Sequence, residues 1–532
     1  MEPKKPPRPL VMLILDGYGI SLIEEGNAIM AAKKPNIDRL MREYPMAVVG
    51  AGGEEVGLPW GEMGNSETGH QNIGSGRIMY QFLSRIDQAI ADKTFFENPQ
   101  LLEALEHVKK NPDAALHMLG MLSNGGVHSH INHQFALLKA ASDAGVGDRT
   151  YIHIFLDGRD SSPDDADGFI GKLEQEMKKT KTGRIETIIG RYYSMDRAGN
   201  WDRTAVAYNL LVHGKGEHFP AWKDAMKTAF ASKDRRMLES APAMVIDGDA
   251  PMRTIQDGDA IIFYNFRSDR ARQITRALMD RTFKKFPTEP WKNVYVATMA
   301  SYDETLKTHA MYKDEEIKLP LGELFSKNEL KQLRIAESEK FAHVTYFFNG
   351  GREKPYPGET DFQIPSIATK DVSEKPEMRA REITSQVLQE IKKDIYDVIV
   401  MNYANPDMVG HTGNFEPTVK AVEIIDEEIG KVADATLAHG GAVLLTCDHG
   451  NAEIVINHLT HQRSTDHTNN PVPVMYIAPD NKQDPPKDDV ILQHVLGTPI
   501  GVLADVAPTA LEILGIKKPK EMSGESLLGS LS

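Results

Sequence analysis

In Leu10-Val-Met-Leu-Ile-Leu-Asp-Gly-Tyr-Gly19, six apolar residues run without interruption into an acidic residue and two glycines. A continuous apolar run closed by a turn is typical of a strand that is buried on both faces of a sheet. Patterns typical of amphipathic helices, such as 371–393 and 416–439, separate further runs of this kind. The alternation predicts an α/β fold with mostly parallel sheets. The further apolar runs are 116–122, 152–156, 185–189, 260–264, 398–401 and 442–446.

Composition narrows the class of protein. The 532 residues include 61 Lys and Arg against 76 Asp and Glu, a net charge of −15, which argues against a general nucleic-acid binder. This length favours two or more domains over one core. A single Cys excludes an intramolecular disulfide and indicates a reducing compartment. No apolar run approaches the roughly 18 residues that a membrane-spanning helix needs, so we expect a cytoplasmic protein without a membrane or nucleic-acid partner.

The residues that follow the predicted strands fall into two sets. In parallel sheets the ligand site lies beyond the carboxyl ends of the strands, so residue types placed there are informative. Strands in the first and last parts of the chain end in Asp and His, whereas strands in the middle end in Arg, Asp and His. This division predicts a discontinuous metal-binding domain, 1–78 with 312–532, and an inserted anion-binding α/β domain, 79–311. The first set is Asp16, Asp407, His411, Asp448 and His449, and the second is His128, Arg159, Asp160, Arg191, Arg197, Arg267 and Arg270.

The first set has the chemistry of a metal site. Asp407 and His411 have the i, i+4 spacing that puts two ligands on one helical face. Asp448 and His449 directly follow a strand, and His467 lies in a polar loop. Carboxylates mixed with imidazoles suit Mn²⁺, Zn²⁺, Co²⁺ or Fe²⁺ better than Ca²⁺. Any one of these residues could serve only in capping or turn formation, but four clusters at strand ends favour metal binding.

Ser66 is the candidate nucleophile. It lies in a glycine-interrupted polar loop, Gly61-Glu-Met-Gly-Asn-Ser-Glu-Thr-Gly-His70, that leads into a predicted helix. A serine in this position can be an ordinary N-cap, or its hydroxyl can face an anion at the helix N-terminus. The loop lacks the Gly-x-Ser-x-Gly arrangement, so activation of the hydroxyl by a metal is the interpretation that uses the Asp and His set.

Eleven motifs in register, from Asp16 to about Pro473, resemble those of the 2,3-bisphosphoglycerate-independent phosphoglycerate mutases of the alkaline phosphatase superfamily. Each motif is weak alone, and the ordered set is specific. The motifs are Asp16-Gly-Tyr-Gly19, Gly64-Asn-Ser-Glu-Thr-Gly-His70, Asn72-Ile-Gly-Ser-Gly-Arg77, Gly125-Gly-Val-His-Ser-His130, Asp157-Gly-Arg-Asp160, Gly190-Arg-Tyr-Tyr-Ser-Met-Asp-Arg197, Asn265-Phe-Arg-Ser-Asp-Arg270, Glu339-Lys-Phe-Ala-His-Val-Thr345, Asp407-Met-Val-Gly-His411, Asp448-His-Gly-Asn-Ala-Glu453 and His467.

The resemblance implies an alkaline-phosphatase-like domain that carries an inserted substrate-binding and phosphotransferase domain. It implies interconversion of 3-phosphoglycerate and 2-phosphoglycerate through a phosphoserine at Ser66, in glycolysis and gluconeogenesis. It also implies a monomer with two divalent metal ions, most often Mn²⁺, with Co²⁺, Mg²⁺ or Zn²⁺ as alternatives, and no requirement for 2,3-bisphosphoglycerate.

The resemblance further assigns residue roles. One metal would be held by Asp407, His411 and His467, and the other by Asp16, Asp448, His449 and the Ser66 oxygen. The matching substrate-binding residues are His128, Arg159, Asp160, Arg191, Arg197, Arg267, Arg270 and Lys340. The chain departs from the family pattern at Asn124, Ser161-Ser162, Ser268 and Asn469, none of which is a proposed ligand.

Two other functions fit parts of the pattern. A phosphohydrolase or phosphopentomutase of the same superfamily would share the metal set, but it has no need of an arginine-bearing insert that retains a dephosphorylated product. A non-catalytic protein that binds phosphorylated metabolites would be expected to lack Ser66 or a metal ligand, and all are present. Several fixed arginines match a small molecule that carries both a phosphate and a carboxylate, because the guanidinium binds either group bidentately.

Overall fold

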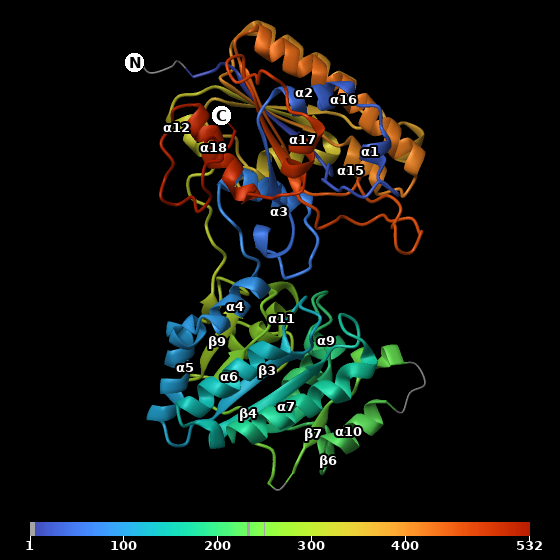
Figure 1. Ribbon diagram of the computed structural model, residues 1–532. Helices are drawn as coiled ribbons and strands as arrows, with labels where there is room; N and C mark the ends of the chain where they lie inside the picture. The colour runs from blue at the N-terminus through green and yellow to red at the C-terminus, as the bar shows by residue number, and fades with distance from the viewer. Residues whose placement is uncertain (1–5, 231–234, 249, 532) are drawn as a thin grey trace. The chain divides into compact units, whose positions relative to one another are not determined.

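The computed structural model describes residues 6–230, 235–248 and 250–531. The chain divides into two compact units: unit 1 is Met1–Gln81 with Glu316–Ser532, and unit 2 is Phe82–Glu315. Each unit has its own eight-stranded sheet, and Figure 1 traces the chain through both by colour. Unit 1 is therefore the discontinuous unit, and unit 2 is formed by one continuous segment.

In unit 1 the first strand lies in the middle of the sheet. β1 (Leu10–Leu15) pairs in parallel with β13 (Val398–Tyr403) on one side and with β14 (Ala442–Cys447) on the other. Its six residues are almost completely buried, as the uninterrupted apolar run predicts. The full strand order is β12 (Glu359–Ile364), β11 (Gln332–Glu337), β13, β1, β14, β15 (Val472–Ile477), β2 (Met46–Gly50) and β16 (Gly501–Val502), and only β15 is antiparallel to its neighbours.

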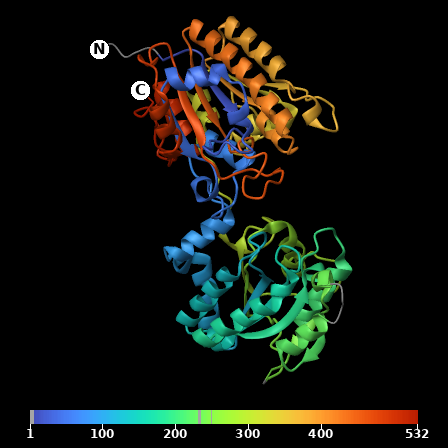
Figure 2. The same cartoon turned by 45° about the vertical axis from the view of Figure 1, so that its right-hand side comes forward.

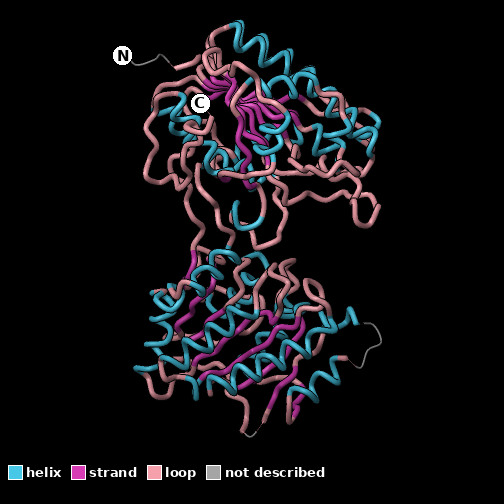
Figure 3. Tube along the Cα trace, in the orientation of Figure 1, coloured by secondary structure: helices cyan, strands magenta, loops and turns pink. Residues whose placement is uncertain are grey.

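Helices cover this sheet in two groups, which Figures 2 and 3 show as coils and cyan tubes around the strands. One group includes the 24-residue α16 (Phe415–Ala438), which contacts α2 (Pro35–Glu43) and α14 (Ala380–Lys393). In the other, α3 (Ser66–Ser75) contacts α12 (Leu321–Lys327) and α18 (Val506–Ile513). Shorter helical elements are α1 (Ala28–Ala31), α13 (Ser338–Ala342), the π-helical turn η6 (His343–Phe347), α15 (Asn405–Gly410) and α17 (Asp489–Leu496).

Unit 2 also consists of a mostly parallel sheet of apolar strands and its helices. Its sheet is parallel except where β5 meets β7, and its apolar strands form a core separate from that of unit 1. The strand order is β10 (His309–Tyr312), β9 (Tyr295–Ala300), β8 (Ala260–Phe263), β3 (Leu116–Leu122), β4 (Thr150–Leu156), β5 (Arg184–Gly190), β7 (Met244–Ile246) and β6 (Glu217–Phe219). The helices are α4 (Phe82–Ala91), α5 (Pro99–Lys110), α6 (Ile131–Asp143), α7 (Ala166–Thr180), α8 (Arg191–Ser194), α9 (Trp201–His213), α10 (Trp222–Ala229) and α11 (Ser268–Met279).

The predicted α/β fold with mostly parallel sheets is confirmed. The two junctions fall at 81/82 and 315/316, a few residues after the expected 78/79 and 311/312. At the first junction, the Gln81 amide donates to the carbonyl of Gly57 and keeps 79–81 with unit 1. At the second, β10 pairs with β9, which places Tyr312 in the sheet of unit 2. Among the described residues, no helix is both long and apolar enough to cross a membrane.

Candidate metal centre and nucleophile

The carboxyl ends of the three central strands of unit 1 bring acidic residues together. Asp16 follows β1 and Asp448 follows β14, and both side chains are fully buried. Asp407 lies on α15, which follows β13. Gly17 allows the turn after β1 to pass close to α15, because its φ is +73° and an added Cβ would lie 2.7 Å from the Asp407 Cα.

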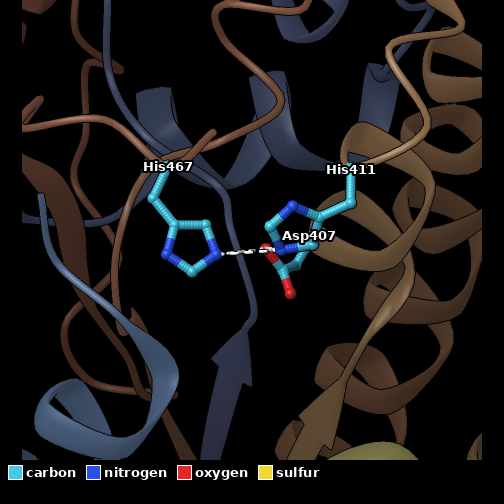
Figure 4. Close-up of side chains that lie close together, drawn as sticks. All are labelled: Asp407, His411 and His467. Carbon is cyan, nitrogen blue, oxygen red and sulfur yellow. Dashed lines mark hydrogen bonds and ion pairs between the residues drawn. The ribbon is translucent and has the colours of Figure 1, made fainter. Parts of the chain in front are cut away.

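Asp407, His411 and His467 form one compact group. Figure 4 shows both imidazoles beside the Asp407 carboxylate, and the Nε2 atom of each histidine lies 3.2 Å from Asp407 Oδ1. The two Nε2 atoms are 3.0 Å apart. His411 follows Asp407 by one turn of helix, whereas His467 comes from a loop 56 residues further along the chain.

The hydrogen bonds of these two histidines fit a bound cation. His411 Nδ1 lies 2.7 Å from the Thr465 carbonyl oxygen, and His467 Nδ1 lies 2.8 Å from that of Gly64. A carbonyl oxygen only accepts, so each Nδ1 carries hydrogen and each Nε2 can present a lone pair. Two lone pairs and a carboxylate oxygen that converge on one point match the ligand set of a borderline divalent metal.

Ser66 begins α3, with Asn65 as its cap: the Asn65 side chain accepts a 2.9 Å hydrogen bond from the Thr68 amide. Ser66 Oγ lies 2.9 Å from His449 Nε2 and 3.2 Å from Asp16 Oδ1. The hydroxyl therefore lies among acidic and imidazole groups, at a helix N-terminus that favours an anion.

Positive charge is strongly favoured around Ser66. Burial would lower the pKa of His449, but the carboxylates of Asp448, Asp16 and Asp407 outweigh burial and raise it to about 9. Burial would raise the pKa of Asp448, but His449 and other nearby cations hold it well below its usual range. These opposite shifts show an electric field that stabilises a cation beside the hydroxyl.

Lys340, on α13, lies inside this cluster. Its Nζ atom is 2.5 Å from Asp16 Oδ1, 2.6 Å from Asp407 Oδ2 and 2.7 Å from Ser66 Oγ. Burial would lower the pKa of Lys340, but the surrounding carboxylates raise it above its usual value. Among the predicted substrate-binding residues, Lys340 thus lies in unit 1 with the metal-ligand candidates.

Three sets of side chains in the described part of the chain offer ligand atoms within 4.8 Å of one another. One set has the residues predicted for the first metal, and the second mixes Asp407 from that prediction with two residues predicted for the other metal. The third includes His70, to which the sequence assigned no role. The sets are Asp407, His411 and His467; Asp16, Asp407 and His449; and Asp16, His70 and Asp448.

The remaining substrate candidates gather in unit 2, after the ends of β3, β4, β5 and β8. His128 is almost fully buried, and burial together with the charge of Arg191 lowers its pKa to about 4. Its Nε2 atom lies 3.9 Å from Asp160 Oδ2. Arg191 Nη1 lies 2.7 Å from that same oxygen and 2.5 Å from Asp157 Oδ1. Two carboxylates therefore fix the orientation of Arg191 beside His128.

Four further arginines, Arg159, Arg197, Arg267 and Arg270, belong to this cluster. Asp269 Oδ2 lies 2.6 Å from Arg197 Nη1, and Asp269 Oδ1 lies 3.2 Å from Arg267 Nε. Burial lowers the pKa of Arg270, and so do the positive charges of Arg191, Arg197 and Arg159. Mutual repulsion of this kind shows that the cations crowd one region, which is the property an anion-binding site needs.

Sequence reasoning missed the residues that hold the ligand candidates in place. Asn451 Nδ2 donates a 2.9 Å hydrogen bond to Asp407 Oδ1, and Asn402 Nδ2 donates a 2.8 Å bond to Asp16 Oδ2. His70 contacts the Ser66 backbone. The sequence signals for His70 are its place at the end of the Gly64–His70 motif and its spacing, four residues after Ser66 on the same helix. Asn402 is the second-last residue of the apolar strand β13, and no separate sequence signal indicated its role.

Comparison with known proteins places this site in a family. A family model described as the metalloenzyme superfamily matches residues 8–518. Mutases named as 2,3-bisphosphoglycerate-independent phosphoglycerate mutase, from Clostridium novyi (strain NT) and Acetivibrio thermocellus, are 48% and 47% identical to the chain, with 98% of this chain and 99% of each relative covered. The chain belongs to the 2,3-bisphosphoglycerate-independent phosphoglycerate mutases.

A solved phosphoglycerate mutase agrees with this assignment. The enzyme from Leishmania mexicana, crystallised at low cobalt concentration, is 29% identical and has a TM-score of 0.56, with 98% of each chain covered. Family membership makes the chain an isomerase that acts on a small-molecule substrate. The resemblance stated from the sequence motifs is confirmed at this level, and divalent metal binding agrees with both the superfamily and the ligand groups.

Proposed function

We propose that the chain interconverts 3-phosphoglycerate and 2-phosphoglycerate through a phosphoserine at Ser66, as a monomer and without 2,3-bisphosphoglycerate, in glycolysis and gluconeogenesis. The observation that carries the proposal is the position of Ser66 Oγ, 2.9 Å from His449 Nε2 and 2.7 Å from Lys340 Nζ at a helix N-terminus. A phosphoryl group on this oxygen would face the amide groups that begin α3.

Two divalent cations, with Mn²⁺ as the proposed metal, complete the site. When bound, they would supply Lewis-acid stabilisation of the Ser66 alkoxide and of the negative charge on the transferring phosphoryl group. One would be held by Asp407, His411 and His467, and the other by Asp16, Asp448, His449 and Ser66 Oγ.

The reaction balances within the chain and its substrate. A bond forms between Ser66 Oγ and phosphorus as the bond from phosphorus to the glycerate oxygen breaks, and the serine proton ends on that glycerate oxygen. The reverse transfer then goes to the other hydroxyl of the same glycerate and returns the proton to Ser66. Lys340 would help to neutralise the phosphoryl oxygens, because its ammonium lies beside the acceptor atom.

The cationic cluster of unit 2 would bind the phosphoglycerate anion. Arg191 is fixed by two carboxylates, whereas Arg267 is half exposed and able to meet a ligand. Guanidinium groups bind a carboxylate and a phosphate in the same bidentate manner, so one cluster can hold the substrate, the glycerate and the product. The other members are His128, Arg159, Asp160, Arg197 and Arg270.

The decisive experiment compares Ser66→Ala with Ser75→Ala, which removes a second buried hydroxyl from the same helix. With purified enzyme, Mn²⁺ and 3-phosphoglycerate, we expect Ser75→Ala to form 2-phosphoglycerate and an acid-stable phosphoserine, and Ser66→Ala to form neither. Chelation should abolish the wild-type activity, and Mn²⁺ or Co²⁺ should restore it best. Substantial turnover by Ser66→Ala, free of host enzyme, would exclude the phosphoserine route.

A further inference from the structure

His70 makes contacts that none of the roles above requires. It is fully buried on α3, one helical turn after Ser66. Its Nδ1 atom lies 2.9 Å from the Ser66 carbonyl oxygen and 3.1 Å from Asp448 Oδ2. Its Nε2 atom lies 3.1 Å from Asn402 Nδ2. One imidazole thus contacts the backbone of the nucleophile, a ligand candidate and a neighbouring strand.

The partners of Asn402 define which ring nitrogen of His70 carries hydrogen. Asn402 Nδ2 donates to Asp16 Oδ2 at 2.8 Å, and a carboxylate only accepts, so the amide nitrogen faces this side. The second hydrogen of the same amide then points to His70 Nε2, which must accept it. His70 Nδ1 consequently carries hydrogen and donates it to the Ser66 carbonyl oxygen, and Asp448 Oδ2 lies 3.1 Å from the same nitrogen.

We infer that His70 and Asn402 are positioning residues that lock the carboxylates of Asp16 and Asp448 in register with Ser66. The order is Asp16, Asn402, His70 and Asp448: Asn402 donates hydrogen bonds to Asp16 and His70, and His70 Nδ1 lies 3.1 Å from Asp448 Oδ2. One chain of polar contacts, which we call the link, thus joins the ends of β1, β13 and β14 to the first turn of α3. This inference rests on the proposed function, because it takes Asp16 and Asp448 to be metal ligands.

The contacts of the link determine which carboxylate oxygen of Asp16 and of Asp448 remains available to bind a metal. Asn402 occupies Asp16 Oδ2, which leaves Oδ1 facing Ser66 Oγ. Asp448 Oδ1 accepts from the backbone amides of Gly17 and His449, whereas its Oδ2 accepts no hydrogen bond from the described residues and lies 3.1 Å from His70 Nδ1. A side chain that fixes a ligand in this way raises metal affinity because less rotational freedom is lost on binding.

The same contacts distinguish His70 from a ligand. A histidine ligand needs a ring nitrogen with a free lone pair directed at the metal. His70 Nδ1 carries hydrogen, and the lone pair of Nε2 is occupied by the Asn402 amide. His70 can therefore shape the group that it forms with Asp16 and Asp448 without joining it as a donor.

The test is the affinity for Mn²⁺ alone, measured by calorimetry on the full chain without substrate, for a set of matched variants. Asparagine can place an N–H near the position of Nδ1, whereas the amide of glutamine reaches toward Nε2. We expect His70→Gln to weaken Mn²⁺ binding by roughly 10- to 100-fold and His70→Asn to recover most of that loss. Asn402→Ala, which keeps His70 but removes the link, should resemble His70→Gln. His153→Gln, at a fully buried histidine in unit 2, should leave Mn²⁺ affinity unchanged.

Three other outcomes would contradict the inference or the proposed function. If the His70 variants and Asn402→Ala lower the melting temperature but bind Mn²⁺ like the wild type, the link is merely structural and the inference is wrong. If His70→Asn loses as much affinity as His70→Gln and the nitrogen coupling in the Mn²⁺ paramagnetic resonance spectrum decreases, His70 is a ligand and the inference is again wrong. If Asp448→Asn keeps full Mn²⁺ affinity, the ligand set of the proposed function fails, whatever His70 does.

Discussion

Lys340 is the residue on which the charge balance of the site depends. Its ammonium lies within 2.6 Å of oxygens from both Asp16 and Asp407, and all three side chains are buried. Removal of one partner from a buried ion pair leaves an uncompensated charge and costs about 3–5 kcal/mol. A bound divalent cation would supply positive charge at the same carboxylates, so the cost of losing Lys340 should depend on metal.

We therefore expect Lys340→Met to lower the free energy of unfolding by about 3–5 kcal/mol in the presence of a chelator, and by clearly less with saturating Mn²⁺. The measurement is denaturant unfolding of both proteins under both conditions. Lys327→Met, at an exposed lysine of α12 paired with Glu323, is the control and should change stability little in either condition. An equal destabilisation of Lys340→Met with and without Mn²⁺ would show that metal and ammonium do not act on the same charges.

Some contacts of this site can be predicted from the sequence, and others cannot. Asp407 and His411 are four positions apart, so their proximity follows from helix geometry alone. His70 and Asn402 are 332 positions apart, and only the pairing of β13 with β1 and the packing of α3 bring them into contact. Contacts of this second kind leave no local pattern, which is why the sequence indicated the ligand candidates and missed the residues that orient them.

At the scale of elements, the sheet of unit 2 contains a buried polar chain across neighbouring strands. His117 on β3 lies 2.9 Å from His153 on β4, which lies 2.9 Å from the Thr187 hydroxyl on β5. His117 Nε2 also lies 3.2 Å from Asp259. Burial lowers the pKa of His117 despite Asp259, and burial together with His117 lowers the pKa of His153 well below its usual value.

These shifts predict that unit 2 loses stability in mild acid. A histidine with a lowered pKa in the folded state binds fewer protons than in the unfolded state, so the free energy of unfolding falls as the pH drops below about 6.5. Between pH 7.5 and 5.5 the loss is up to about 1.4 kcal/mol for each such histidine.

Hydrogen exchange of the β3 and β4 amides, corrected for the intrinsic pH dependence, measures this loss in unit 2 by itself. We expect His153→Gln to be less stable at pH 7.5 but to show a smaller decrease on acidification. His494→Gln, at an exposed histidine of α17, should behave like the wild type. An unchanged decrease in His153→Gln would mean that other groups cause the acid sensitivity.

At the scale of the whole molecule, the α/β fold and the existence of two units followed from periodicity and from the types of residue at strand ends. Strands with two buried faces can be recognised in the sequence, because their apolar residues are uninterrupted. The position of Tyr312 in the sheet of unit 2 could not be predicted from the sequence, since β10 is a short strand at the edge of that sheet. The order of the strands also cannot be predicted from local sequence, because it depends on contacts between segments that are distant in the chain.

The two units are expected to have different roles in the reaction. In the proposed function, Ser66 and the metals accept the phosphoryl group, whereas Arg267 and Arg270 bind the substrate and retain the glycerate until the phosphoryl group returns. Each lost charge-assisted contact should weaken binding by roughly 1.5–3 kcal/mol, so the double variant Arg267→Ala/Arg270→Ala should lose mutase activity by orders of magnitude. Metal content should stay at the wild-type value, because neither arginine lies in unit 1.

The products should shift as well, since a phosphoserine whose glycerate has escaped can only pass its phosphoryl group to water. We expect the ratio of free phosphate to 2-phosphoglycerate, measured side by side from 3-phosphoglycerate, to rise in the double variant. Arg276→Ala removes an arginine from the same helix, α11, where it pairs with Asp303, and should keep the wild-type ratio. If hydrolysis and transfer fall together at an unchanged ratio, the two arginines support binding only, and retention of the glycerate must be assigned to other residues.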